Sequence, residues 1–240
     1  MTASRLSLKQ LGLVLFFLGV LLAFVLSAMM TWADVESISY GFPRVGNKPM
    51  GGLSCPAFMN RMEHASFSIT LKNSTERRLR PQVQVMISEP GLSRWRTINT
   101  PFELEAGQRK TATWDIGAED IVLGSFVLVK AYTFASYPQP DVEGSCGIFV
   151  LSIPGIRADV LFWLWLAASL VFLITGLWLS DFRKVEGKRS TRKVFARILL
   201  AALVLFGLFA GYMGWWIFGI LVLVVITLAL PAMLFFRQNI

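Results

Sequence analysis

Long apolar runs alternate with charged segments along this chain of 240 residues. An α-helix rises about 1.5 Å per residue, so roughly 20 apolar residues cross the ~30 Å hydrocarbon layer of a membrane. Four runs are close to that length: residues 11–32, 160–180, 194–211 and 215–236. The last two lie within one long apolar stretch, which Gly211–Trp216 interrupts with glycines and interfacial aromatic residues. The pattern therefore predicts four transmembrane α-helices.

Residues 33–159, between the first and second runs, follow a different period. Phe67, Ile69 and Leu71 alternate with polar residues, and Val83, Val85 and Ile87 recur at the same spacing. Turn-forming clusters separate such runs at intervals of about ten residues, which is typical of antiparallel β-sandwiches. The sequence predicts one all-β sandwich domain inserted between the first and second spans.

The distribution of charge predicts the orientation of the spans. The net charge is +8, yet residues 33–159 hold thirteen basic and thirteen acidic residues, and the other ten basic residues flank the spans. Basic residues beside spans resist translocation. This pattern predicts a cytoplasmic head (1–10), loop (181–193) and tail (237–240), with residues 33–159 extracytoplasmic. The basic residues expected to hold the loop inside are Arg183, Lys184, Lys188, Arg189, Arg192 and Lys193.

This orientation predicts a multi-pass protein of the cell (plasma or inner) membrane. It also accounts for the whole net positive charge, which therefore gives no reason to expect a nucleic-acid partner. Membrane lipids are expected partners, because basic clusters beside a span attract anionic headgroups.

The first apolar run has a second interpretation, a cleaved signal peptide. Residues 31–33 loosely fit a small-x-small cleavage site. The apolar region of a signal peptide is usually only about 7–15 residues long. A retained membrane anchor is therefore expected, with cleavage as the open alternative.

The apolar cores of the runs carry no ionisable residues, which argues against a transport path through this chain, since moving ions need partners in the membrane. Gly207 and Gly211 form a G-x-x-x-G spacing in the third run. Small residues at this spacing allow close approach of helices. We expect them to pack the bundle internally.

The alternating segments also resemble a known family. Four segments, Phe67–Thr75, Val83–Ile87, Leu104–Gln108 and Ala112–Ile116, are similar to the strands and turns of bacterial Ig-like domains of the CARDB class. The resemblance implies an Ig-like β-sandwich that binds or spaces other molecules, and it transfers no functional residue.

Cys55 and Cys146 are the only cysteines, and both fall in the predicted domain. An even pair outside the cytoplasm predicts a disulfide. Closing a loop of about 90 residues would stabilise the fold by roughly 4–5 kcal/mol through chain entropy. Two free thiols are the alternative. No metal site is expected, because His64 is the only histidine and zinc needs three or four ligands.

Candidate catalytic groups are sparse. His64 has no nucleophile motif to serve, and the acidic pairs Glu103/Glu105 and Glu119/Asp120 flank turns, where carboxylates are ordinarily solvated. The sequence therefore predicts a protein that is not an enzyme and needs no cofactor.

Arg94, Trp95 and Arg96 are the best candidate for a partner-binding surface, because Arg and Trp are enriched at interface hot spots. A solvated hairpin end is the alternative. The leading hypothesis is a non-catalytic, membrane-anchored accessory or scaffold protein whose Ig-like domain contacts a partner protein or envelope component within a membrane complex. The alternative is a membrane subunit of an FtsX-like or MacB-like ATPase-driven system, whose order of spans and external domain is similar.

Overall fold

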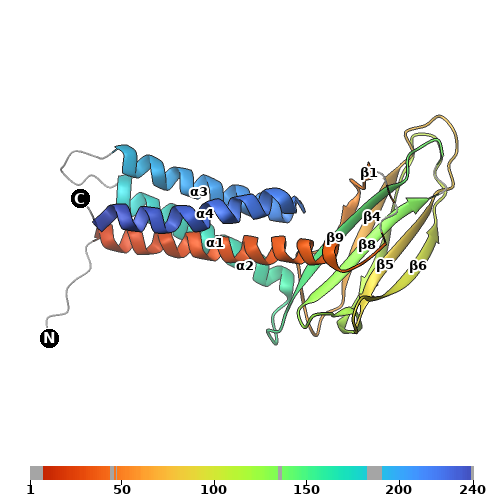
Figure 1. Cartoon of the computed structure of the whole chain (residues 1–240), viewed down its shortest axis with the longest axis horizontal. Helices are drawn as coiled ribbons and strands as arrows, with labels where there is room; N and C mark the ends of the chain where they lie inside the picture. The colour runs from red at the N-terminus through yellow and green to blue at the C-terminus, as the bar shows by residue number, and fades with distance from the viewer. Residues whose placement is uncertain (1–7, 44–45, 47, 135–136, 183–190, 239–240) are drawn as a thin grey trace. The chain divides into compact units, whose positions relative to one another are not determined.

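The structure is a computed structural model that describes residues 8–43, 46, 48–134, 137–182 and 191–238. The chain divides into two compact units. The helical unit contains the residues up to Thr31 and those from Leu161 onward, and the β-unit is Trp32–Val160. Figure 1 shows the elements of each unit.

The helical unit is built from four helices: α1 (Leu8–Ser39), α2 (Ala158–Leu177), α3 (Thr191–Tyr212) and α4 (Trp216–Gln238). A single π-helical turn, Trp178–Phe182, extends α2. Three segments among the described residues are long and apolar enough to cross a membrane: Leu8–Ser39, Ala158–Ser180 and Val194–Tyr212. The apolar part of α4, Trp216–Pro231, is shorter. These helices fit a membrane location.

Glycines bring the helices of this unit close to α1. A Cβ added at Gly207 would lie 3.0 Å from Val222 Cγ1 and 3.2 Å from Ser27 Oγ. At Gly211 a Cβ would lie 3.3 Å from Met30 Cβ. Gly207 therefore lies against both α4 and α1, and Gly211 lies against α1, within the same chain, where larger residues would separate the helices.

Other glycines allow α1 and α2 to approach each other closely. A Cβ at Gly12 would lie 2.8 Å from Leu179 Cβ, and a Cβ at Gly176 would overlap the backbone of Phe16. Gly219 of α4 lies against Thr31 in the same way, and a Cβ there would lie 2.5 Å from its Oγ1. Helix α1 is thus the common partner of the other three.

The β-unit contains two sheets. The larger sheet has the strand order β1-β9-β8-β5-β6, with β3 also pairing with β9, and the smaller has the order β2-β4-β7. The strands of the larger sheet are β1 (Lys48–Pro49), β3 (Phe58–Asn60), β5 (Gln82–Glu89), β6 (Arg94–Pro101), β8 (Phe126–Phe134) and β9 (Val142–Leu151). Those of the smaller sheet are β2 (Leu53–Ser54), β4 (Ala65–Lys72) and β7 (Arg109–Ile116).

The prediction of an antiparallel sandwich is wrong for the larger sheet, which contains both parallel and antiparallel pairs. Both β1 and β3 run parallel to β9, on the edge of β9 that faces away from β8. After α1 the chain runs alongside β9 and in the same direction as β9, and it pairs with β9 through the two short strands β1 and β3. Alternation within a strand does not encode the direction of its neighbour.

The main core lies between the two sheets and follows the predicted alternation. Val83, Val85 and Ile87 of β5 are fully buried on the inner face of the larger sheet. The ring of Phe67 in β4 stacks on that of Trp114 in β7, with centroids 5.5 Å apart. Large aromatic rings of this kind dominate the apolar area that a small domain buries.

A second core lies on the other face of the larger sheet. Met86 of β5 and Leu128 of β8 are buried there, together with Ala33, Tyr40 and Phe42. Helix α1 does not end at Trp32, as the sequence predicted, but continues to Ser39. Its last two turns pack on this face of the sheet. Removing the side chains of Met86 and Leu128 from water favours this packing.

Candidate functional site

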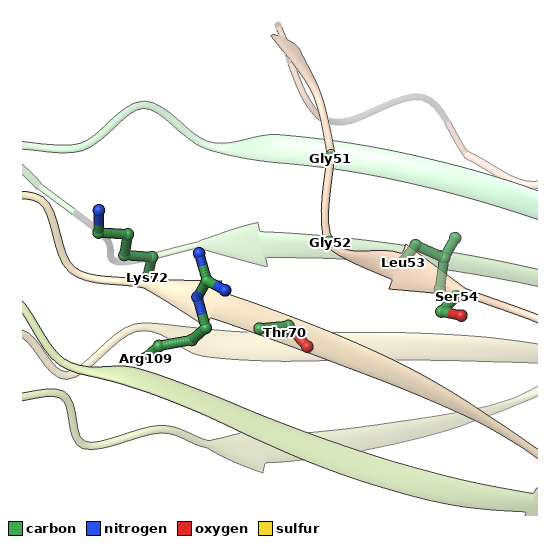
Figure 2. A pocket seen from close by; sticks show the side chains of 7 residues that line it. All are labelled: Gly51, Gly52, Leu53, Ser54, Thr70, Lys72 and Arg109. Carbon is green, nitrogen blue, oxygen red and sulfur yellow. The ribbon is translucent and has the colours of Figure 1, made fainter. Parts of the chain in front are cut away.

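A pocket of about 390 Å³ opens on the smaller sheet. It is lined by the segment Gly51–Ser54 with Thr70, Lys72 and Arg109. Figure 2 shows the side chains of Lys72 and Arg109 extending side by side from neighbouring strands. The pocket combines backbone, hydroxyl groups and two cations.

The strand register brings the two cations together. Lys72 is the last residue of β4 and Arg109 the first of β7, and they are direct cross-strand partners. Both side chains are exposed. Neither forms a salt bridge with an acidic residue in the described part of the chain. Like charges placed directly opposite each other destabilise a sheet.

The turns beside the pocket are held by Asn73, which is fully buried. Its Nδ2 donates to the backbone carbonyls of Arg77, Leu104 and Glu105, at 2.7, 3.2 and 3.0 Å. The backbone N–H of Asn73 donates to the carbonyl of Gln108, at 2.8 Å. These bonds fix the end of β4 to the turn that precedes β7, and so fix the positions from which the two cations extend.

Gly52 allows the segment Gly51–Ser54, which lines the pocket, to approach β4 closely. The N–H of Thr70 donates to the carbonyl of Gly52 at 2.9 Å, and a Cβ on Gly52 would overlap the carbonyl oxygen of Thr70. Only glycine allows this approach. The hydroxyl groups of Thr70 and Thr111 are hydrogen-bonded to each other at 2.8 Å.

The three residues predicted to form a partner-binding surface do not lie on one surface. Trp95 is half-buried and packs on Phe42, with ring centroids 5.5 Å apart. Arg96 points to the opposite face of β6, as alternate residues in a strand do. Arg94 alone is exposed. A partner-contact role for Arg94, Trp95 and Arg96 stays a prediction.

Arg96 forms a salt bridge at the end of the larger sheet. Its Nε and Nη2 donate to Asp120 Oδ1 and Oδ2, at 3.0 and 2.9 Å. The Asp120 side chain is only 1% exposed and also accepts from the N–H of Gly117, at 3.0 Å. This two-point pairing with a buried carboxylate gives Arg96 a structural role.

The hydroxyl of Tyr40, the residue after the end of α1, forms a hydrogen bond with strand β6. It donates to the carbonyl of Arg94 at 2.9 Å. Burial raises the pKa of Tyr40 above its ordinary value, which further favours the protonated hydroxyl that donates this bond.

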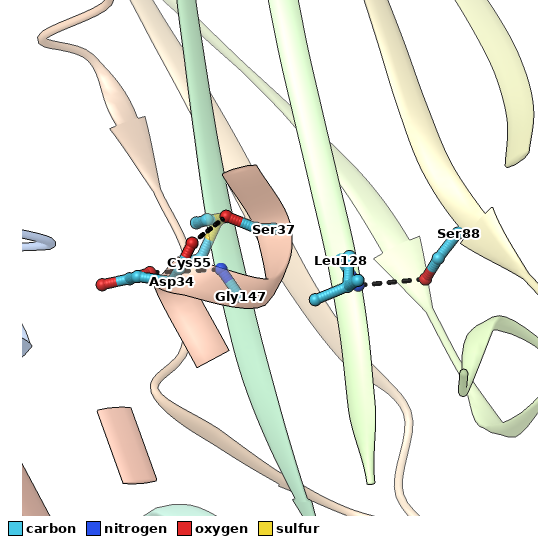
Figure 3. The surroundings of a disulfide bond; sticks show 7 residues. Asp34, Ser37, Cys55, Ser88, Leu128 and Gly147 are labelled. Atoms are coloured by element: carbon cyan, nitrogen blue, oxygen red, sulfur yellow. Dashed lines mark hydrogen bonds between the residues drawn. A yellow bond between two sulfur atoms is a disulfide. The ribbon is translucent and has the colours of Figure 1, made fainter. Parts of the chain in front are cut away.

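The predicted disulfide joins Cys55 and Cys146, whose Cα atoms are 6.5 Å apart. Both residues are half-buried. The bond ties the segment before β3 to the middle of β9. Figure 3 shows its surroundings, which include Asp34 and Gly147.

Asp34 lies at the point where α1 meets β9. It is 8% exposed, and its Oδ1 accepts a hydrogen bond from the N–H of Gly147 at 3.2 Å. A Cβ on Gly147 would overlap the carbonyl of Ala33. Glycine therefore lets the helix backbone rest directly on the strand.

The start of α2 is held in a comparable way. One carboxylate oxygen of Glu63 accepts from the N–H of Ala158, the first residue of α2, at 3.1 Å. The Nδ2 of Asn60 donates to the carbonyls of Ile153 and Ile156, the latter at 2.9 Å. Glu63 thus caps a helix N-terminus, where an anion is favoured.

Of the predicted basic loop, Arg183, Lys184, Lys188 and Arg189 lie outside the described residues. Arg192 and Lys193 fall in the first turn of α3, but their side chains are also outside the described part. No group of three or more His, Cys, Asp or Glu residues that could hold a metal ion occurs among the residues described.

Sequence comparisons find no match: no model of a protein family and no curated protein matches this chain. Solved structures do resemble part of it. A CARDB domain from Pyrococcus furiosus, solved in complex with di-metal ions, is 12% identical over 42% of this chain and 90% of its own, with a TM-score of 0.34. The predicted resemblance to CARDB-type domains is therefore confirmed.

Two enzymes also resemble the chain. A β-glucosidase from Listeria innocua is 18% identical, with a TM-score of 0.31, over 42% of this chain but only 15% of its own. An alkylpurine DNA glycosylase from Pseudomonas fluorescens is 15% identical, with a TM-score of 0.32, over 43% of this chain and 31% of its own. This chain therefore spans only a small part of either enzyme.

The prediction that the chain is not an enzyme is contradicted by these likenesses and is withdrawn. Domains similar to this one occur within glycosidases and a DNA glycosylase. The small number of reactive residues in the predicted domain is therefore no ground for excluding catalysis. No reaction is assigned to this chain.

Proposed function

We propose that the chain is a membrane-anchored accessory or scaffold subunit of a larger membrane complex. Its β-unit lies outside the cytoplasm and contacts a partner protein or an envelope component. Both chain termini lie inside, as the distribution of basic residues favours. The disulfide supports this orientation, since such bonds persist in oxidising compartments.

The proposal includes a fourth span formed by α4. This helix has 23 residues, and at about 1.5 Å per residue it reaches roughly the thickness of the hydrocarbon layer. The preceding turn contains Gly214, whose φ of +69° suits a tight reversal between α3 and α4. A hairpin of two spans is therefore consistent with the local geometry.

The observation that carries the proposal is that hydrogen bonds within the β-unit order the residues at which the main chain enters and leaves it. Asp34 joins the end of α1 to β9, and Glu63 caps the start of α2. Ordered entry and exit residues suit a β-unit that presents a defined surface to a partner.

Chemical cross-linking in native membranes, followed by purification of the full chain in a mild detergent, tests this function. The expected result is a reproducible cross-linked partner that stays bound through purification. The matched control is the Glu63→Ala variant, which removes the cap of α2 and should reduce the yield of the complex. Recovery of the wild-type chain as an isolated monomer, with no cross-linked species, contradicts the proposal.

The alternative of an ATPase-driven system is favoured by the order of elements, with one helix before the β-unit and three after it. It differs in one measurable way. Co-purification of a cytoplasmic ATPase, with ATP-dependent retention of the complex, would identify that system.

A further inference from the structure

We infer that the pocket on the smaller sheet binds a sugar or polyol that carries a phosphate or carboxylate group. This inference does not depend on the proposed accessory role, because it concerns only the pocket between β2, β4 and β7. It starts from the charge of Lys72 and Arg109.

The two cations differ from several other basic residues of the β-unit in forming no salt bridge among the described residues. Five basic residues of the unit do pair with acidic residues: Arg78, Arg80, Arg96, Lys130 and Arg157. Lys72 and Arg109 are instead placed directly opposite each other, at a cost in repulsion. An anion bound between them would remove this repulsion and gain two charge-assisted hydrogen-bonding groups.

The nature of the cations favours a phosphate or carboxylate. The guanidinium of Arg109 offers paired N–H groups that match two oxygens of such an anion, and the ammonium of Lys72 adds a point charge. Figure 2 shows both groups on the same side of the strands, toward the Gly51–Gly52 segment.

The remaining lining favours a ligand larger than a free ion. The volume of about 390 Å³ lies in the range of small-molecule pockets, roughly 300–1,000 Å³. Ser54 and Thr70 add hydroxyl groups to the lining, which can bond to the hydroxyl groups of a sugar or polyol. Nothing lies within 4 Å of a Cβ added at Gly51, so this side of the pocket is open for the rest of the ligand.

Binding to the full chain in phosphatidylcholine nanodiscs tests the inference, with glucose 6-phosphate and glucuronate as probes and glucose as the neutral control. Isothermal titration calorimetry should show saturable binding of both anionic probes and none of glucose. The double variant Lys72→Gln/Arg109→Gln should bind at least tenfold more weakly. Its unfolding midpoint without ligand should equal or exceed that of the wild type, because the repulsion is gone.

The control variant Arg61→Gln/Arg94→Gln removes the same charge elsewhere in the β-unit and should bind like the wild type. Absence of saturable binding, or equal weakening in both double variants, would overturn the assignment. Inorganic phosphate binding as tightly as glucose 6-phosphate would overturn the sugar or polyol component. Displacement of glucuronate by phosphatidylglycerol vesicles, but not by glucose 6-phosphate, would assign the pocket to a lipid headgroup and also overturn the proposal.

Discussion

The carboxylate of Asp34, on helix α1, accepts a hydrogen bond from the backbone N–H of Gly147, on strand β9, at 3.2 Å. The bond gives a partner to a backbone N–H on a stretch of the β9 edge where no strand pairs with it. The edge pairs with β1 at Val142–Glu143 and with β3 at Phe149–Leu151, and Gly147 lies between these two stretches. An unpaired strand N–H would otherwise be buried there, at the cost of a lost hydrogen bond.

Substituting Gly147 by alanine tests the close approach of α1 to β9. The new Cβ would overlap the carbonyl of Ala33, so helix or strand must shift. Overpacking of this kind costs about 1–3 kcal/mol. Chemical denaturation of the full chain in detergent should show a loss of that size. Gly51→Ala is the control, since its Cβ would meet nothing within 4 Å, and equal stability of the two variants would contradict the packing described.

Substitutions of Asp34 separate its hydrogen bond from its charge. Asp34→Ala leaves the Gly147 N–H unpaired and should lower the free energy of unfolding by about 1–3 kcal/mol. Asp34→Asn keeps an acceptor oxygen in the same place and should lose less. The same denaturation experiment compares them. A larger loss in Asp34→Asn than in Asp34→Ala would show that the hydrogen bond is not the stabilising interaction.

Arg96 and Arg94 should behave differently although they are two residues apart. Arg96→Met leaves the buried carboxylate of Asp120 without its cation, and breaking such a pair costs roughly 3–5 kcal/mol. Arg94→Ala, at an exposed site, should change stability by no more than about 0.5 kcal/mol. Thermal unfolding of both variants measures the difference. Adding Asp120→Asn, which removes the charge and keeps an acceptor for the Gly117 N–H, to Arg96→Met should recover part of the loss. No recovery would count against the ion pair as the cause.

The disulfide predicts both a stability effect and a compartment. Cys55→Ser should destabilise the β-unit by roughly 4–5 kcal/mol, since the bond closes a loop with a sequence separation of 91. In cells, neither cysteine should react with a polyethylene-glycol maleimide until the protein is reduced. Two maleimide groups per chain without reduction would place the pair in a reducing compartment and contradict the orientation of the spans.

The alternating pattern was sufficient to predict the inner faces of the strands, but not the second core. Val83, Val85 and Ile87 show the period of two directly. Met86 interrupts that period, and so does the continuous run of β8, Phe126–Val129. Such interruptions are the signal of a strand buried on both faces. They do not say what covers the second face.

The continuation of α1 over this second face could not be predicted, because the charged residues Asp34 and Glu36 are typical of a solvated segment after a membrane span. In the structure these residues continue α1, and Asp34 is buried against β9. The pocket was missed for a related reason. Lys72 and Arg109 are distant in sequence, and only the register of β4 against β7 makes them neighbours. Register depends on the packing of whole strands, which local pattern does not specify.

Hydrogen–deuterium exchange of the full chain in nanodiscs tests most directly whether hydrogen bonds order the residues at which the main chain enters and leaves the β-unit. We expect slow exchange for the amides of Val35–Ser39, Gly147 and Ala158, comparable with that of the central strands β5 and β8. Slow exchange requires hydrogen bonds that open only with the surrounding structure. Rapid exchange at these amides, with β5 and β8 still protected, would contradict the hydrogen bonds described for Asp34 and Glu63.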